Sequence, residues 1–394
     1  MSLKEQFGKD ILLTGWGHSP FGKLTEETLE SLIVQVATEA INNSGLDAGQ
    51  IDEIYLGQFN AGMTPLAFPS SLALQVSEAL ANVPATRVEN ACASGSAAMQ
   101  QGAKALLAGT AKNVLVIGAE KMTHAGADVV GAALLGADYD MAGKSSITGF
   151  TGLFAEVAKH YQARYGDVAD VLGSIAAKNH RNGVDNPYAQ LRKDLGEDFC
   201  RTVSAKNPVV AAPLRRTDCS PVSDGAAAVV LSVVPTNGAT SPVRLAGFGH
   251  ANDFMPAERR DPTAFAGVTA SFERAFAMAG IGLEDLDFAE VHDCFTIAEL
   301  LVYEAMGLTA PGQGSRAVEE GWVYKEGKLP VNVSGGLKAK GHPVGATGVS
   351  QHVIAAMQLT GTAGAMQLPN ARRAAVQNMG GVGIANYVSI LEAV

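Results

Sequence analysis

The sequence has only four cysteines, and they lie far apart. Cys92, Cys200, Cys219 and Cys294 form no C-x-x-C pair, so their spacing fits neither a disulfide scaffold nor a zinc site. We therefore expect reduced thiols, a cytoplasmic location and no bound metal ion. Long apolar runs are also lacking: none approaches the roughly 18 residues of a membrane span, and 226–234 is among the longest. We expect no membrane-spanning segment.

Targeting signals and nucleotide-binding loops are missing as well. The first ten residues carry charges where a secretory signal is apolar, and the last residues, LEAV, match neither a peroxisomal nor a retention signal. The turn 377–383 (QNMGGVG) has no P-loop lysine and no G-x-G-x-x-G spacing. Charged residues make up 17% of the chain and its net charge is −10, which argues against non-specific nucleic-acid binding.

What the chain does have is apolar residues and glycine. Its 394 residues are 47% hydrophobic and include 44 glycines. This balance excludes intrinsic disorder, and at roughly 150 residues a domain the length corresponds to two or three domains. The glycines follow no collagen-like period, so they indicate tight turns and close backbone approaches.

Two stretches of the chain repeat the same order of elements. Helical apolar spacing at 29–41 precedes a short strand at 54–56, and a helix at 272–279 precedes a strand at 288–291. Each stretch continues as strand, small-residue turn, helix and buried strand: 86–88, 91–96, 97–108 and 114–117 in the first, and 330–333, 341–348, 349–359 and 374–376 in the second. This alternation predicts parallel sheets covered by helices, in an α/β fold built by internal duplication.

A segment of different texture separates the two copies. It has scattered glycines and a charged helix-like run near 156–165, and an ordinary connection of such length is uncommon. We interpret it as an insertion that reaches over a site between the halves. The expected division of the chain is 1–121 for the first half, 122–218 for the insertion, 219–240 for a return strand of the first half, and 241–394 for the second half.

Cys92 is the first candidate for chemistry. It lies in 90–96 (NACASGS), between a predicted strand and a predicted helix. A helix N-terminus stabilises an anion, which would lower the thiol pKa from about 8.5 toward 7 and leave the thiol about half ionised at neutral pH. The alternative is a buried structural cysteine, because free cysteine is among the most buried residue types.

Two histidines lie in turns that suit a catalytic site. In 340–348 (KGHPVGATG), glycines and a proline present His342 at a helix start, as a base or an oxyanion donor, although a satisfied turn histidine has the same pattern. The motif 292–295 (HDCF) follows the late strand, where α/β folds collect ligands. Asp293 suits a cap for the following helix, which does not account for His292 and Cys294 on either side of it.

The last turn and a few basic residues are candidates for binding anions. Gly380 and Gly381 can offer backbone N–H groups to an oxyanion. A local basic patch is either an anion site on an acidic protein or a set of solvated side chains, and its members are Arg215, Arg216, Lys338 and Lys340.

Taken together, these motifs resemble the thiolase superfamily over nearly the whole chain, and within it the sterol-carrier-protein-type thiolases. The resemblance rests on the turn around Cys92, on 219–227 (CSPVSDGAA), on 292–295 and on 341–348. It implies a duplicated five-layered α-β-α-β-α fold with an inserted loop domain. It also implies an acyltransferase of lipid metabolism and β-oxidation, which cleaves 3-ketoacyl-CoA with CoA into acetyl-CoA and a shortened acyl-CoA, or runs the reverse Claisen condensation.

The resemblance further implies roles for individual residues. Cys92 matches the nucleophile that is acylated, and His342 matches the histidine that activates it. Most thiolases have Asn-Glu-Ala-Phe where this chain has 292–295, and an acid/base cysteine where it has Asn378. Cys294 looks like the replacement for that cysteine, as in the sterol-carrier type, and His292 would hold a water molecule or the thioester oxygen.

The same resemblance implies how substrates are held. The N–H groups of Cys92 and Gly380 would stabilise one oxyanion, and His342 with His292 the other. We expect contacts with CoA or substrate from Phe295, Ser334, Gly335, Arg215 and Lys338. The resemblance implies no cofactor beyond the CoA thioesters themselves, a homodimer or homotetramer, and room for a small accessory protein.

Competing interpretations share the fold but not the motifs. Acyl-CoA aldolases of this fold lack the nucleophilic cysteine, and 3-ketoacyl synthases and hydroxymethylglutaryl-CoA synthases lack the pairing of HDCF with GHPVGATG. A non-catalytic thiolase-like scaffold subunit is disfavoured because Cys92, Cys294 and His342 are all present. Acyl chain length, and the choice between steroid and linear substrates, depend on the shape of the pocket.

Overall fold

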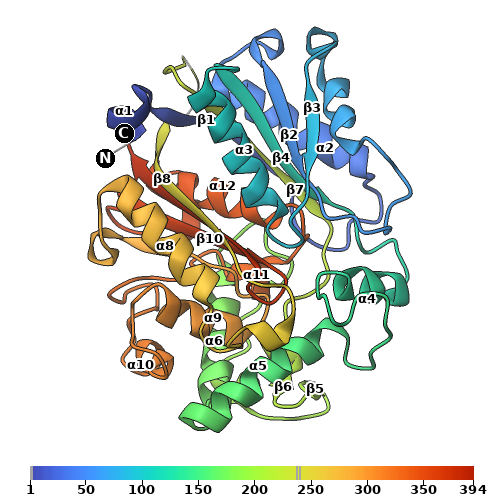
Figure 1. The fold of residues 1–394 in the computed structure, drawn as a ribbon, viewed down its shortest axis with the longest axis vertical. Helices are drawn as coiled ribbons and strands as arrows, with labels where there is room; N and C mark the ends of the chain where they lie inside the picture. The colour runs from blue at the N-terminus through green and yellow to red at the C-terminus, as the bar shows by residue number, and fades with distance from the viewer. Residues whose placement is uncertain (1–2, 237, 239–240) are drawn as a thin grey trace.

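The computed structural model of the protein describes residues 3–236, 238 and 241–394 (Figure 1). Within these residues, the main feature is a nine-stranded sheet in the order β3-β2-β4-β7-β1-β8-β11-β10-β9. Its strands are β1 Ile11–His18, β2 Glu53–Gly57, β3 Ala85–Val88, β4 Asn113–Glu120, β7 Gly225–Ser232, β8 Val243–Asn252, β9 Phe288–Glu290, β10 Arg373–Gly380 and β11 Ala385–Ala393. A short pairing of β1 with β8 joins the two half-sheets.

The two half-sheets confirm the internal duplication. In the first, helix α2 (Leu29–Ser44) follows β1, and helix α3 (Ser94–Ala108) connects β3 to β4. In the second, helix α8 (Ala266–Ala279) follows β8, and helix α12 (Thr347–Leu359) precedes β10. Val331 forms a parallel β-bridge with Ala289 of β9, in the same way as β3 pairs in parallel with β2 in the first half. The strand order of the first half therefore recurs in the second.

Helices cover both faces of each half-sheet. Helix α2 packs on β1 and β7, and helix α8 packs on β8 and β11. Helices α3 and α12 pack on each other and on strands of both halves, so they form the central layer. The result is the expected five-layered arrangement. Strands β1, β4 and β7 are buried along their whole length because a helix layer lies on each side of them.

The strands are not all parallel, so that part of the prediction was wrong. Strand β7 runs antiparallel to both β1 and β4, and β11 runs antiparallel to β8 and β10. Strands β10 and β11 are joined by a tight turn, which permits only an antiparallel pair. Apolar periodicity reports burial on two faces, and it carries no information about strand direction.

The segment between β4 and β7 leaves the sheet and forms its own elements. These are α4 Ala127–Leu135, α5 Gly149–Tyr165, α6 Ala169–Val184, α7 Glu197–Arg201, β5 Val209–Ala211 and β6 Leu214–Arg215. They occupy the lower part of the molecule in Figure 1, together with α9 Thr296–Ala305, α10 Gly314–Glu319 and α11 Gly336–Lys340 of the second half, whereas α1 Leu3–Phe7 lies near the chain ends. Helix α6 packs against α9 and α11, so the insertion contacts the second half.

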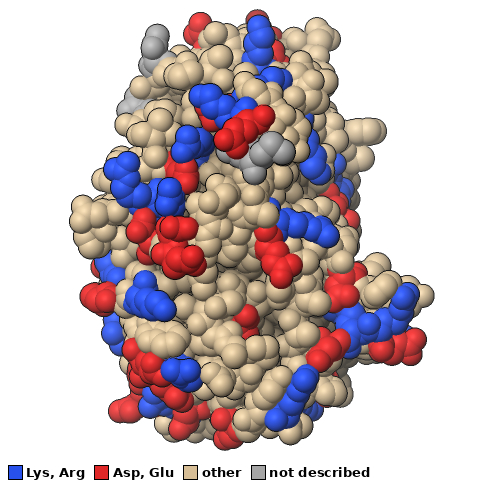
Figure 2. Space-filling view, turned by 60° about the vertical axis from the view of Figure 1, so that its left-hand side comes forward, with Lys and Arg blue, Asp and Glu red and all other residues tan. Residues whose placement is uncertain are grey.

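The domain boundaries inferred from the sequence remain predictions. Residues 237, 239 and 240 of the expected return segment lie outside the described residues. Among the described residues, no helix has the length and apolar character needed to cross a bilayer. Basic and acidic side chains are interspersed on the face seen in Figure 2, so this face presents no extended basic surface to a nucleic acid.

Candidate active site

The turns that carry Cys92 and His342 are held together by closely packed helix starts. A Cβ atom on Gly95, at the start of α3, would lie 2.8 Å from the backbone oxygen of Gly345. A Cβ atom on Gly348, at the start of α12, would lie 2.3 Å from the backbone nitrogen of Ser96. Only glycine permits this approach of the two central helices. Their packing brings two turns from opposite halves of the chain side by side.

Cys92 sits in a strained turn between β3 and α3. The preceding residue, Ala91, has a φ angle of 49°, which is unusual for a residue other than glycine. The Ser94 hydroxyl closes this turn, because it accepts a hydrogen bond from the Asn90 N–H at 2.9 Å and donates one to the Ala91 oxygen at 2.6 Å. The Cys92 side chain is buried, with 4% of the residue exposed.

Burial dominates the acidity of Cys92. It raises the pKa of the thiol to about 12, although a hydrogen bond from the Gly381 backbone acts in the opposite direction and Glu120 adds to the increase. The expected shift toward 7 was therefore wrong, because desolvation of the thiolate outweighs the helix N-terminus. The resting site holds a neutral thiol.

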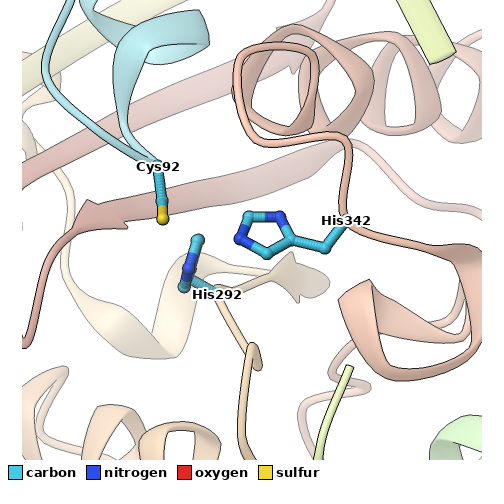
Figure 3. A group of neighbouring side chains, drawn as sticks. All are labelled: Cys92, His292 and His342. Carbon is cyan, nitrogen blue, oxygen red and sulfur yellow. The ribbon is translucent and has the colours of Figure 1, made fainter. Parts of the chain in front are cut away.

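Three side chains converge from three separate turns. The Cys92 sulfur and one ring nitrogen each of His292 and His342 all lie within 4.8 Å of one another. Figure 3 shows the two imidazoles beside the sulfur; their ring centroids are 5.1 Å apart and their planes are nearly perpendicular, at 85°. A thiol and two imidazoles are donor types that zinc also binds, so the protonation of the imidazoles decides what the cluster can do.

His342 is arranged as a base. Burial, followed by the charge of Lys340, lowers the pKa of His342 to about 3, so the ring is neutral. The Thr347 hydroxyl donates its only hydrogen to the Pro343 oxygen at 3.0 Å and lies 2.7 Å from His342 Nδ1. With the hydroxyl directed at Pro343 in this way, Nδ1 donates to Thr347 and a lone pair stays on Nε2, which is the tautomer that a base requires.

His292 is held by different partners. Its backbone N–H donates to the Gln377 side chain at 2.9 Å, and its Nδ1 lies 2.9 Å from the Asn378 amide nitrogen. Burial, followed by the neighbouring His342, places the pKa of His292 well below its usual value. Among the described groups, His292 Nε2 has no hydrogen-bond partner.

Cys294 lines the same cavity as Cys92. This cavity has a volume of about 190 Å³, and its walls include His342, Phe295 and a third cysteine, Cys219. Burial raises the pKa of Cys294 well above its usual value, and Cys92 and Asp293 add to the increase. The sequence did not single out Cys219 as a site residue, because its place beside Cys294 depends on a bridge between residues 219 and 295.

The motif that contains Cys294 rests on a buried polar network. The sequence predicts that Asp293 caps the helix that follows it, but the carboxylate instead accepts hydrogen bonds from the N–H groups of Leu337 and Lys338, at 2.6 and 3.2 Å, at the start of α11. Asn179 joins Asp293 to Glu299, with hydrogen bonds of 2.7 and 2.6 Å. Lys178 forms a buried ion pair with Glu299 at 2.9 Å. The cap prediction was wrong because the tertiary fold brings a different helix start to the carboxylate.

Most residues expected to contact CoA or substrate have partners within the protein. Phe295 lines the cavity, but Arg215 forms a buried ion pair with Asp218 at 2.8 Å. The Ser334 hydroxyl donates to Glu290, and a Cβ on Gly335 would meet Gly183. Lys338 is buried. Gly380 and Gly381 line a different cavity, which borders the Cys92 turn at Asn90 and Ala91, and a backbone hydrogen bond from Gly381 reaches the Cys92 sulfur. Contacts of Ser334, Gly335, Arg215 and Lys338 with CoA remain predictions.

Comparisons with known proteins agree with this fold. Residues 13–234 match the thiolase N-terminal domain, and residues 249–393 match the thiolase C-terminal domain-like family. The acetyl-CoA acetyltransferase of Methanothermobacter thermautotrophicus is 34% identical over 378 residues, which cover 95% of this chain and 97% of the relative. Human sterol carrier protein 2 is 33% identical over 388 residues, which cover 94% of this chain and 70% of the relative.

A solved structure extends the likeness to the whole fold. An aldolase described as Ltp2-ChsH2(DUF35) superposes with a TM-score of 0.80 and 20% identity, over 98% of each chain. Fold, motifs and relatives together define the class of this protein as an acyltransferase. The chain belongs to the thiolase family.

Proposed function

We propose that this thiolase carries its acyl group on Cys92 and uses Cys294 as its acid and base. The observation that supports this most strongly is the convergence of both thiols and His342 on one cavity. Two thiols are needed because the first is covalently occupied when an α-proton has to be moved. Asn378 stands where most thiolases have their second cysteine, and Cys294 supplies a thiol at the same cavity from another turn.

In the cleavage direction, the Cys92 sulfur attacks the 3-oxo carbon of a 3-ketoacyl-CoA while its proton passes to His342 Nε2. The tetrahedral intermediate then breaks its C2–C3 bond, and the acyl group stays on Cys92. The electron pair of the broken bond forms the enolate of acetyl-CoA, which takes a proton from the Cys294 thiol. Because burial opposes an ion pair between Cys92 and His342, proton transfer accompanies formation of the C–S bond.

The second half of the cycle restores both thiols. The Cys294 thiolate removes the thiol proton of a second CoA, whose sulfur attacks the acyl group. Cys92 departs and regains its proton from His342. N–H groups of Cys92 and of Gly380 or Gly381 face the tetrahedral oxyanion, and His292 with His342 faces the enolate oxygen. The cycle requires no resident cofactor or metal ion, because side chains supply every proton transfer.

Acetyl-CoA is the two-carbon product or donor in this proposal. The names of the relatives support this choice, and a free thiol state for all four cysteines supports a reducing, cytoplasmic location. The physiological direction, cleavage in β-oxidation or condensation, depends on substrate levels, since the same residues serve both.

A second copy of the chain is the proposed partner. Strand β3 is one edge of the sheet, and its middle residues Thr86 and Arg87 are exposed, so its unpaired backbone groups suit pairing with another β3. We expect Ala85→Pro, which removes an N–H that faces away from β2, to convert a dimer to a monomer in light scattering. The DUF35 component named with the similar aldolase supports an accessory protein as a further partner, which co-purification would detect.

The test is CoA-dependent cleavage of acetoacetyl-CoA and of a longer 3-ketoacyl-CoA. Cys92→Ala and Cys294→Ala should both lose cleavage, and Cys92 should be the residue labelled by an acyl-CoA. Cys200→Ala is the matched control, because Cys200 is buried in the insertion among Ala176 and Ala177. Wild-type protein in which an acyl-CoA labels Cys92 without cleavage would favour an unusual acyl acceptor or a missing partner protein, and absence of labelling would favour a scaffold.

A further inference from the structure

The amide of Asn378 has only one orientation that satisfies its neighbours. Its nitrogen lies 3.1 Å from the backbone oxygen of Cys92 and 2.9 Å from His292 Nδ1. A backbone oxygen can only accept a hydrogen bond. Rotating the amide by 180° would place its own oxygen against the Cys92 oxygen, so the nitrogen must face it.

This orientation determines where the proton of His292 lies. One N–H of the Asn378 amide donates to the Cys92 oxygen, and the other points to His292 Nδ1, which must then offer a lone pair. The buried ring is neutral, so its single proton is on Nε2. That N–H is a buried donor without a partner among the described groups, and such a donor is costly unless a ligand completes it.

The proposed roles of the two imidazoles require opposite tautomers. As a base, His342 needs its proton on Nδ1, toward Thr347, and a lone pair on Nε2. His292 accepts at Nδ1 and keeps a proton on Nε2, as an oxyanion donor requires. Zinc would need a lone pair from His292, and neither nitrogen has a free one, so the hydrogen bonds favour acyl chemistry over metal binding at this cluster.

We propose that Asn378 is a positioning residue, which fixes His292 as the Nε2–H tautomer so that this N–H stabilises the enolate oxygen of the bound thioester. The inference rests on the proposed function. In the condensation direction, the Cα–H bond of acetyl-CoA breaks, the proton moves to the Cys294 thiolate, and the electron pair moves onto the thioester oxygen that His292 Nε2–H contacts. The position that holds an acid/base thiol in most thiolases here holds the amide that orients His292.

The kinetic test separates the two chemical steps. Exchange of the α-protons of acetyl-CoA with deuterated solvent reports enolate formation, and acetylation of Cys92, followed by intact mass, reports nucleophilic attack. Asn378→Leu keeps the volume and removes both N–H donors, so we expect exchange to fall about 10²–10³-fold, as for loss of one oxyanion donor, with acetylation within severalfold of wild type.

The matched control is Asn113→Leu. Asn113 lies at the start of β4, where its amide donates to the Gln50 oxygen at 3.0 Å and accepts from the Ser232 hydroxyl at 2.7 Å. This substitution removes comparable hydrogen bonds at the end of β4 opposite Glu120, the residue of this strand whose charge acts on Cys92, and both rates should persist. Equal losses of exchange and acetylation in Asn378→Leu would mean that the amide only holds the Cys92 turn, and retention of both rates would also overturn the inference.

A spectroscopic test observes the wild-type protein, so it does not depend on whether a variant of Asn378 folds. In protein labelled with ¹⁵N-histidine, we expect the ring of His292 to show its proton on Nε2, with assignment from the signals lost in His292→Gln. A proton on Nδ1 of His292 would overturn the inference even if the enzyme is fully active. Failure of wild-type protein to acetylate Cys92 would instead contradict the proposed function.

Discussion

The Cys92 thiol should become reactive only well above neutral pH when no substrate is bound. Burial raises its pKa to about 12, and a pKa about three above that of an ordinary thiol corresponds to about a 10³-fold smaller thiolate fraction at neutral pH. The thiolate is the species that alkylating agents attack. Alkylation of Cys92 should therefore rise about tenfold for each pH unit up to about pH 10, without a plateau.

The measurement is the rate of Cys92 modification by iodoacetamide, followed by mass spectrometry of the peptide that contains it. The chain unfolded in urea is the reference, and its cysteines should level off above their ordinary pKa of about 8.5. Burial of Cys92 also slows the approach of iodoacetamide, but by the same factor at every pH. The slope of the logarithm of the modification rate against pH therefore reports the pKa of the thiol alone.

A plateau in the native protein near pH 7 would refute this reasoning, because it would mean that Cys92 rests as a thiolate paired with protonated His342. The variant His342→Asn distinguishes the two cases. We expect it to leave the alkylation rate of the free enzyme within severalfold of wild type while abolishing cleavage, since His342 acts only as the C–S bond forms. An ion pair would make the same variant much less reactive toward iodoacetamide.

Other predictions concern the acid/base and the buried charges. Cys294→Ala should lower cleavage about 10²–10⁴-fold yet leave acylation of Cys92 detectable by intact mass; near-normal turnover would exclude the acid/base role. Lys178→Met leaves a buried carboxylate without its cation and should lower the free energy of unfolding in urea by about 3–5 kcal/mol, whereas Lys159→Met, at an exposed ion pair, should change it by at most about 1 kcal/mol. Burial opposes ionisation of Asp224, but hydrogen bonds from its neighbours hold its pKa below the usual value, so it contributes stability above about pH 4 that is lost as pH falls. The deficit of Asp224→Asn in urea unfolding should therefore shrink in acid, and a deficit independent of pH would contradict this.

Local patterns in the sequence predicted the duplication and the turns that carry chemistry. Helical spacing at 29–41 and 272–279 became α2 and α8, and the turns at Cys92 and His342 begin α3 and α12. These features depend on residues close together in the chain, where periodicity and small-residue turns leave a readable signal. The resemblance of the motifs to thiolases was confirmed by the family matches.

Long-range packing decided what those patterns could not express. Strand direction follows from the route that the chain takes between strands. The hydrogen-bond partner of Asp293 is set by which helix start packs against its carboxylate. The acidity of Cys92 follows from its burial by side chains of both halves and of the insertion. The contact of Asn378 with His292 joins residues 86 positions apart. The sequence by itself determined which groups are present, and only the tertiary structure decided which of them are neutral, which way their protons point, and which face one another, because desolvation and hydrogen bonding depend on neighbours distant in the chain.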